Sequence, residues 1–230
     1  MGRITNEQEY AIKRKEILEV ARGLVFTRGY EQMAIQDILD ELRMSKGAFY
    51  HYFASKQALL EALVDSMRLE AEQILLPIVQ DNHLAALEKL GRFFNTISLW
   101  KTEQKDFLLG LLRAWYSDEN AIVRQKMQVL AIQWYAPMLT SIIQQGIREG
   151  TLGTAHPDLA GEMALHLLLG MGDAMSGVLL SSEAAQVAQS QLQHTLAAYT
   201  DALERLLGAP AGSLKIMEPE TLEAWVVSST

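Results

Sequence analysis

The most informative segment of this chain is residues 45–56, which read Ser45-Lys46-Gly47-Ala48-Phe49-Tyr50-His51-Tyr52-Phe53-Ala54-Ser55-Lys56. Phe49 and Phe53 are four residues apart, so on a helix they face the same side and can enter a core. The other side then presents a lysine, an alanine, a tyrosine and a histidine. Facing a DNA duplex, the alanine would allow close approach to base edges, while the polar side chains would contact phosphates or bases. A purely structural role, with the tyrosines and the histidine covering a small core, fits the same residues.

The helices around this segment predict a helix-turn-helix unit. Residues 17–25 carry one apolar stripe, and Gly29 can end that helix in the left-handed conformation. A second stripe occupies residues 35–42, and Ser45 and Ser55 are placed to cap the two helices that follow. Three short helices, with a brief turn between the second and the third, are typical of a helix-turn-helix.

The remaining sequence also has a helical period and contains no alternating run, so we predict an all-α protein of about nine helices. The helices expected beyond residue 54 are 55–80, 83–101, 104–117, 119–149, 157–180 and 183–207. Pro157 is expected at the start of one of them, where its missing N–H costs least. We therefore expect a DNA-binding domain at 1–54, a helical effector-binding and dimerisation domain at 55–208, and a tail at 209–230 that could end in a short docked helix.

Composition and charge are compatible with this organisation. The chain has 230 residues, of which 49% are hydrophobic, and it has no cysteine, which excludes disulfides and thiolate metal sites. Its net charge of −8 is uneven: residues 1–60 carry nine Lys or Arg and eight Asp or Glu, whereas the rest carries eleven and twenty. The acidic average therefore does not argue against DNA binding by the N-terminal part.

The sequence predicts a cytoplasmic protein. Residues 1–9 lack the apolar run of a secretory signal. Residues 159–180 are long enough to span a membrane, but Glu162, His166 and Asp173 lie among them and would be costly in a bilayer. We interpret this segment as a buried helix of a soluble protein. No interaction of the protein with a membrane is expected.

Residues 45–53, with 55–60 after them, closely resemble the recognition helix and the following helix start of the tetracycline-repressor (TetR) family. Residues 21–30 are similar to the family's first helix and its Gly-aromatic exit, and residues 142–150 to the end of its seventh helix. The resemblance implies a DNA-binding regulator, with Lys56 on a phosphate at the start of the fourth helix. The DNA contacts expected are Lys46, Gly47, Ala48, Tyr50, His51, Tyr52 and Lys56.

Two positions depart from the family pattern. The family usually has a threonine where Ala34 stands, and its hydroxyl caps the second helix and reaches a phosphate. The turn after that helix usually contains Ala-Gly, whereas here it reads Leu42-Arg43-Met44. Arg43 must therefore adopt a positive φ at some cost or alter the turn. A compensating phosphate contact by Arg43 is a further hypothesis.

A homodimer is expected because operators are normally read by two such units about one helical turn of DNA apart. Residues 183–207 carry an apolar stripe suited to a seam. The preceding helix is apolar nearly all round and has small residues on one side, where another helix could approach. The predicted interface residues are Gly170, Ala174, Gly177, Leu192, Leu196, Tyr199, Leu203 and Leu206. A single large monomeric core is the alternative, while the resemblance implies a four-helix bundle formed by two helices of each subunit.

An effector site is expected in the middle helices, which concentrate aromatic and methionine residues and include Pro137, expected to kink its helix. Such residues are usually just core, but in the resembled family this region is the effector cavity. The candidates are Trp100, Phe107, Trp115, Trp134, Met138, His166 and Met171.

The function predicted is that of a ligand-responsive regulator, most simply a repressor that binds a palindromic operator as a dimer and is released by a small apolar or amphipathic effector. The alternative is a DNA-binding regulator without an effector. An enzyme is not expected, because the five histidines are scattered and no catalytic constellation or metal-ligand spacing occurs. No metal or cofactor is expected; Gly170-Met171-Gly172 lies within an apolar helix with no strand before it, so it does not predict a nucleotide-binding loop.

Overall fold

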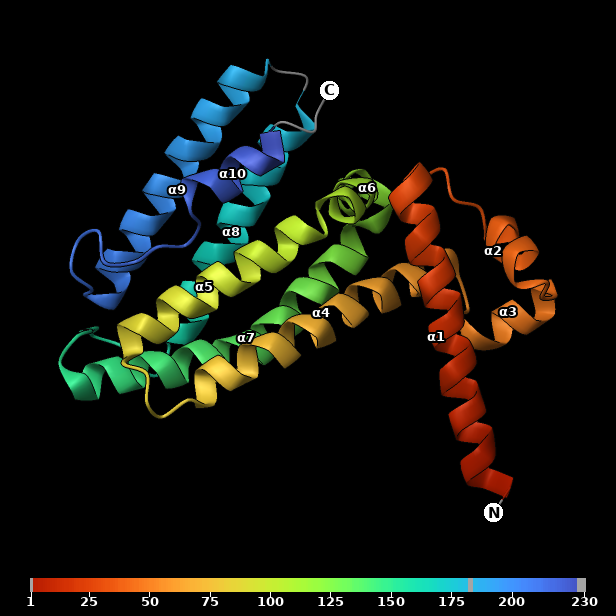
Figure 1. Cartoon of the computed structure of the whole chain (residues 1–230), viewed down its shortest axis with the longest axis horizontal. Coiled ribbons are helices and arrows are strands. Elements are labelled where there is room, and N and C mark those ends of the chain that lie inside the picture. Colours follow the sequence, from red (N-terminus) through yellow and green to blue (C-terminus); the bar gives the residue numbers. More distant parts are fainter. Residues whose placement is uncertain (1, 182–183, 227–230) are drawn as a thin grey trace. The chain divides into compact units, whose positions relative to one another are not determined.

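The structure, a computed structural model, describes residues 2–181 and 184–226. The regular elements in these ranges are all helices, as predicted, and they contain no strand (Figure 1). The chain divides into two compact units. The N-terminal unit comprises Met1–Arg68 and Lys105–Met127, and the C-terminal unit comprises Leu69–Gln104 and Gln128–Thr230. The predicted boundary between residues 54 and 55 separates a DNA-binding part from an effector-binding and dimerisation part. That functional division stays a prediction.

In the N-terminal unit, the predicted apolar stripes form the core. Three helices come first: α1 (Gly2–Arg28), α2 (Ile35–Leu42) and α3 (Lys46–Tyr52). The unit is completed by the first part of α4 (Lys56–Gln80), α6 (Lys105–Tyr116), the 3-10 helix η1 (Asp118–Asn120) and the first part of α7 (Ala121–Glu149). Ile17 of α1, Ile38 of α2 and Phe49 of α3 are fully buried.

The predicted helix stop and caps are confirmed. Gly29 has a φ of 78°, and its N–H donates to the Val25 carbonyl at 2.9 Å. The Ser45 hydroxyl accepts from the Ala48 N–H at 3.2 Å, and the Ser55 hydroxyl accepts from the Ala58 N–H at 3.0 Å. These contacts set the lengths of α1, α3 and α4 at the point where the helix-turn-helix is built.

Helix α6 belongs to the N-terminal unit because it packs closely on α1. A Cβ added at Gly110 would lie 2.6 Å from the Val25 carbonyl oxygen, so only glycine allows this approach. The Tyr30 N–H donates to the Gly110 carbonyl at 3.1 Å. This hydrogen bond joins the residue that follows the end of α1 to a helix that lies 80 residues away in the sequence.

The C-terminal unit contains the rest of α4 and α7 together with α5 (Ala86–Glu103), α8 (Ala160–Leu180), α9 (Ala185–Leu207) and α10 (Pro219–Val226). Helices α8 and α9 pack side by side (Figure 1). Helix α7 continues past Pro137 without interruption. The core of this unit includes Leu75, Leu90, Phe94, Leu139, Ile143, Ala160 and Leu203.

Two predicted helix starts were wrong by three residues. Helix α5 begins at Ala86 rather than at residue 83, because the Leu84 N–H donates to the Asp81 carbonyl in a turn. Helix α8 begins at Ala160 rather than at residue 157, and Pro157 lies in a turn closed by the Leu159 N–H on the His156 carbonyl at 3.2 Å. The start expected for the last long helix, residue 183, lies outside the described residues, and α9 is described from Ala185.

The N-terminus of α5 is capped by a residue from the far end of α7. Ala85 precedes the helix and has no side chain able to cap it, but the Glu149 carboxylate accepts from the Ala86 N–H at 2.9 Å. This hydrogen bond, with a second from the Gln145 amide, holds the pKa of Glu149 below its ordinary value. The ionised form is therefore the one that stabilises the fold.

The Glu149 cap predicts a pH-dependent contribution to stability. Because the folded pKa is lowered, the contribution is present above the unfolded pKa and is lost as the pH falls through the folded pKa. Glu149→Ala is expected to melt below the native chain at pH 7, and the difference should shrink towards pH 3. Thermal melts across that range measure it. Glu88→Ala, which removes an exposed carboxylate paired with Arg92, is the control and should change little; an equal gap for Glu149→Ala at both pH values would contradict the cap.

The end of the chain docks within the C-terminal unit. The buried Glu204 carboxylate accepts from the N–H groups of Gly212 and Leu214, both at 2.9 Å, and so orders the linker after α9. Helix α10 packs on α9 and α5, with Leu222 and Val226 buried. Of the tail expected at 209–230, residues 227–230 lie outside the described part of the chain.

Helix α8 is long and apolar enough to cross a membrane by length and composition. Its ionisable residues Glu162, His166 and Asp173 are all exposed. Ionisable groups on that surface would be costly in hydrocarbon. The helix therefore fits a protein surface better than a bilayer.

Candidate nucleic-acid interface

Helix α3 has one buried face and one exposed face, as its sequence predicted. Phe49 and Phe53 are 0% and 2% exposed, and their ring centroids are 5.9 Å apart. The residues on the exposed side are Lys46, Gly47, Ala48, Tyr50 and His51. Tyr50 is 41% exposed although it is a large aromatic residue. This face therefore offers a cation, hydrogen-bonding groups and a small residue at one surface.

Tyr10 of α1 supports α3 and was missed in the sequence. Its ring lies 4.8 Å from the Tyr52 ring and 5.5 Å from the His51 ring, measured between centroids. Tyr52 is accordingly half-buried, whereas His51 keeps an exposed edge. Tyr10 lies seven residues before Ile17, a helical spacing that could have placed it on the inner face of α1. The packing of Tyr10 therefore orients His51 and Tyr52, which lie at the C-terminal end of the predicted DNA-contact face.

Lys56 links the start of α4 to the exit of α1. Its ammonium donates to the Glu31 carbonyl at 3.2 Å and lies 4.6 Å from the Tyr30 ring centroid. The Tyr30 hydroxyl donates back to the Lys56 carbonyl at 2.6 Å. Burial lowers the pKa of Lys56, opposed by the nearby carboxylates of Glu31, Asp37 and Glu119. The phosphate contact of Lys56 stays a prediction. Its side chain is already held in place by the contacts with Glu31 and Tyr30.

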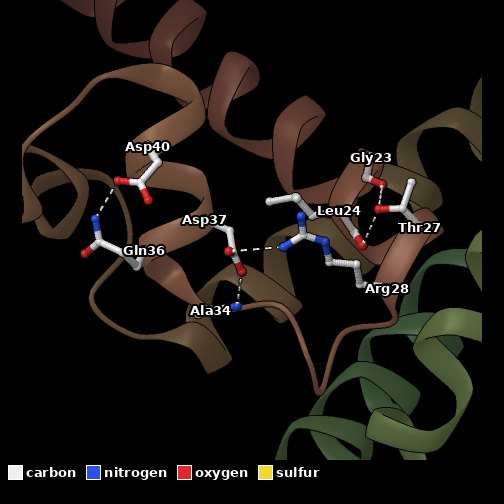
Figure 2. Close-up of polar contacts among 8 residues, drawn as sticks. All are labelled: Gly23, Leu24, Thr27, Arg28, Ala34, Gln36, Asp37 and Asp40. Carbon is white, nitrogen blue, oxygen red and sulfur yellow. Dashed lines mark hydrogen bonds and ion pairs between the residues drawn. The ribbon is translucent and has the colours of Figure 1, made fainter.

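Helix α2 begins without a capping hydroxyl, and Asp37 takes over part of that task. One Asp37 carboxylate oxygen accepts from the Ala34 N–H at 2.7 Å, and the other lies 3.2 Å from the Arg28 guanidinium (Figure 2). Nearby, the Thr27 hydroxyl donates to the Gly23 carbonyl at 3.1 Å, within its own helix. The absence of the family's threonine therefore leaves helix α2 ordered, but it removes the hydroxyl that would reach a phosphate.

Arg43 takes the first of the two alternatives left open by the sequence. It has φ 49° and ψ 41°, and it is the non-glycine residue with a positive φ among the described residues. The Met44 N–H donates to the Leu39 carbonyl at 3.0 Å, so the turn between α2 and α3 keeps a helix-end geometry. Arg43 thus lies three residues before the start of α3 with its side chain exposed, and its backbone conformation is strained.

Arg43→Gly is expected to raise the free energy of unfolding by about 0.5–1 kcal/mol, because glycine adopts this conformation without a Cβ clash but loses more chain entropy on folding. Urea unfolding measures the change. Arg43→Ala is the matched control, since it removes the guanidinium and keeps the strain. If Arg43 contacts a phosphate, both variants should lower the salt slope of operator binding by about two for a dimer; an unchanged slope would remove that hypothesis.

The predicted effector residues do not form one cluster within a single unit. Phe107 and Trp115 belong to the N-terminal unit, and the other candidates belong to the C-terminal unit. Met138 and Met171 join its buried core, whereas Trp100 and Trp134 are half-buried. His166 is exposed, and its Nε2 lies 3.8 Å from a Glu162 carboxylate oxygen. His166 therefore lies on the surface of α8, whereas Met138 and Met171 are buried.

The predicted dimer-interface residues fall into two groups, those that are covered within their own protomer and those that stay exposed. Leu192 and Leu203 are 0% exposed because they pack inside their own chain, which corrects their assignment to an intermolecular seam. Tyr199 covers Gly170 within the protomer: a Cβ at that glycine would lie 3.3 Å from the tyrosine hydroxyl. Leu196 and Leu206 are half-buried. Ala174 and Gly177 of α8 are the predicted interface residues that stay exposed.

Comparison with known proteins agrees with this geometry. Residues 17–63 match the model of bacterial regulatory proteins of the tetR family. The repressor DhaR of Mycobacterium sp. (strain GP1), a helix-turn-helix transcriptional repressor, is 24% identical over 156 residues, which cover 68% of this chain and 76% of DhaR. Most of the curated relatives found are likewise named as regulators or repressors of transcription.

Solved structures share the fold over most of the chain. A TetR-family transcriptional regulator from Pectobacterium atrosepticum superposes with a TM-score of 0.65 at 20% identity, covering 88% of this chain and 98% of that one. RolR, in complex with its ligand resorcinol, superposes with a TM-score of 0.60 at 17% identity, covering 95% of each chain. The recognition helix, the family match over residues 17–63 and the shared fold thus agree in making this chain similar to bacterial regulatory proteins of the tetR family.

Proposed function

We propose that this protein is a ligand-responsive repressor that binds a palindromic operator as a homodimer and is released by a small apolar or amphipathic effector. The observation that carries the proposal is the exposed face of α3, where Tyr50 remains on the surface while Phe49 beside it is fully buried. An exposed aromatic residue next to Lys46 and Ala48 is poorly explained by folding alone. It suits a helix that enters the major groove.

Two kinds of DNA contact are assigned to this face. Lys46, Arg43 and Lys56 would neutralise phosphates and position the protein, which by itself gives no sequence preference. Ala48, Tyr50 and His51 would lie at base edges. Gly47 would allow the helix to come close to the DNA, and Tyr52 would hold the helix in place.

The dimer is proposed through the exposed face of α8. Helix α8 is apolar over most of its length, yet only five of its residues, Ala160, Gly161, Ala164, Leu165 and Met171, are buried in the protomer. Ala174 and Gly177 lie on this exposed surface, where small side chains let another helix come close. A second protomer would remove this apolar area from water and would bring two recognition helices to one operator.

The effector site is proposed in the C-terminal unit, where Trp100, Trp134, Met138 and Met171 supply apolar surface. RolR, a protein of the same fold, binds resorcinol, which supports a small ligand in this architecture. Ligand binding would favour a state in which the two recognition helices no longer match successive major grooves. The loss of DNA affinity would equal the ligand's differential affinity for the two states. Such a regulator would act in the cytoplasm.

The test is a fluorescence-anisotropy titration of the purified protein against DNA flanking its own coding region, at several salt concentrations. The proposal expects nanomolar, sequence-selective binding with a steep salt slope and at least one dimer per site. Weak binding that is indifferent to sequence at every flanking fragment would contradict it. A small molecule that raises the melting temperature and weakens operator binding would separate a ligand-gated repressor from a regulator without an effector.

A further inference from the structure

Three aromatic rings, those of Tyr10, His51 and Tyr52, meet where the N-terminal half of α1 reaches the end of α3. The Tyr10 ring centroid lies 4.8 Å from that of Tyr52 and 5.5 Å from that of His51, and the His51 and Tyr52 centroids are 5.3 Å apart. The plane of the His51 ring stands at 88° to Tyr10 and at 78° to Tyr52. Each ring of this cluster therefore contacts the other two.

Helix α1 holds Tyr10 against α3. Tyr10, Arg14, Ile17 and Ala21 are spaced by four, three and four residues, which places them on one face of the helix. Ile17 and Ala21 are fully buried, and the guanidinium carbon of Arg14 lies 4.9 Å from the Phe53 ring centroid. The packing that builds the core of the N-terminal unit therefore also fixes the position of Tyr10.

The ring cluster restricts His51 before any DNA is bound. Two edge-to-face contacts favour one orientation of the imidazole, yet His51 stays exposed, so its ring is oriented without being buried. A contact to a base edge depends on the direction of a hydrogen bond, whereas attraction to a phosphate depends mainly on charge. The orientation of this ring therefore matters for reading a base and matters little for general affinity.

We propose that Tyr10 is a positioning residue for sequence recognition, which holds the His51 imidazole in the orientation that reads one base pair of the operator. The inference rests on the proposed function, which places His51 at base edges. Tyr10 itself need not touch DNA. Because the orientation is set in the free protein, the matching base pair is read without the entropy loss of an unrestrained side chain. Without the Tyr10 ring, His51 would accept several base pairs with similar affinity.

Tyr10→Leu tests the proposal, because it keeps an apolar side chain on α1 and removes the flat ring. Each full-length protein selects from a pool of random DNA duplexes of about 30 base pairs, or about three helical turns, and the bound DNA is sequenced. His51→Ala in the same selection identifies the base pair that His51 reads. The preference of Tyr10→Leu at that base pair should fall about fivefold, while the preferences at other base pairs stay within about twofold of the native ones.

A positioning role differs from a merely structural one in three measurable ways. Tyr10→Phe keeps the ring and should keep the native preference. In the His51→Ala background, Tyr10→Leu should change no base preference further, since a positioning residue acts only through the residue that it positions. The salt slope for the selected duplex should be the same in the native chain and in Tyr10→Leu, because the substitution changes no cation.

Phe26→Leu is the matched control, since it also replaces an aromatic residue of α1 by leucine. Phe26 is 57% exposed and lies near the other end of the helix, so every base preference should stay as it is. The protein without DNA gives an independent measurement. The proton NMR signal of the His51 imidazole, assigned by its loss in His51→Ala, should move in Tyr10→Leu and much less in Tyr10→Phe, because the ring current of Tyr10 acts on nearby protons.

An unmoved His51 signal in Tyr10→Leu would overturn the contact itself. An unchanged preference at the base pair that His51 reads, an equal loss at all base pairs, or a lower salt slope in Tyr10→Leu would overturn the positioning role. If the native chain selects a duplex but His51→Ala changes no base preference, the DNA-binding function stands and the role of Tyr10 falls. If the native chain selects no duplex, the proposed function falls and the positioning role falls with it.

Discussion

Phe49→Ala is expected to lower the free energy of unfolding by about 3–5 kcal/mol, the largest stability effect that one substitution in the helix-turn-helix should have. Phe49 is 0% exposed and lies between Tyr50 and Phe53 at ring-centroid distances of 5.5 and 5.9 Å. Its removal takes away buried apolar area and leaves a cavity that short helices cannot fill. Urea unfolding followed by circular dichroism measures the loss.

Tyr50→Ala is the matched control, one residue along the same helix and on its exposed side. Because it removes only the edge-to-face contact with Phe49, it should lower the free energy of unfolding by about 0.5–1.5 kcal/mol, well below the loss for Phe49→Ala. Operator affinity should instead fall about tenfold, if the ring lies at base edges as proposed. A large stability loss for Tyr50→Ala with unchanged DNA binding would contradict the assignment of the two faces.

Ala174→Arg is expected to convert the protein to monomers and to weaken operator binding by about 100-fold or more. The substitution places a long, charged side chain on the exposed surface of α8 near Gly177, where a partner helix is proposed to pack. A monomer engages one half-site and loses the gain of simultaneous binding by two linked units. Analytical ultracentrifugation and anisotropy measure the two effects.

Gln133→Arg provides the control, because Gln133 is also exposed within a helix of the C-terminal unit but lies on α7. It should leave both the oligomeric state and the operator affinity unchanged. A native chain that is monomeric, or an Ala174→Arg variant that stays dimeric, would show that the exposed face of α8 is not the interface.

The signals that sequence reasoning used with success act over short distances. Gly29, Ser45 and Ser55 each complete a hydrogen bond with a backbone group no more than four residues away. The division of α3 into two faces follows from the spacing of Phe49 and Phe53. Such features depend on local geometry, which the order of residues specifies.

The features that were missed connect distant parts of the chain. The Glu149 carboxylate caps α5 at Ala86, 63 residues earlier, and no local pattern announces such a contact. Tyr10 packs on His51 and Tyr52, more than 40 residues later.

The order of residues was enough to predict that the chain is helical, where its first helices end, and which side of α3 stays on the surface. What covers each apolar stripe became clear only from the packing of the folded chain: Leu192 and Leu203 looked like a seam for a second subunit, but they lie in the core of their own chain. That packing also decided that Arg43 adopts a positive φ. The reason is that the hydrophobic effect depends on the area removed from water and has no direction, so a periodic pattern identifies a face that must be buried without identifying its partner.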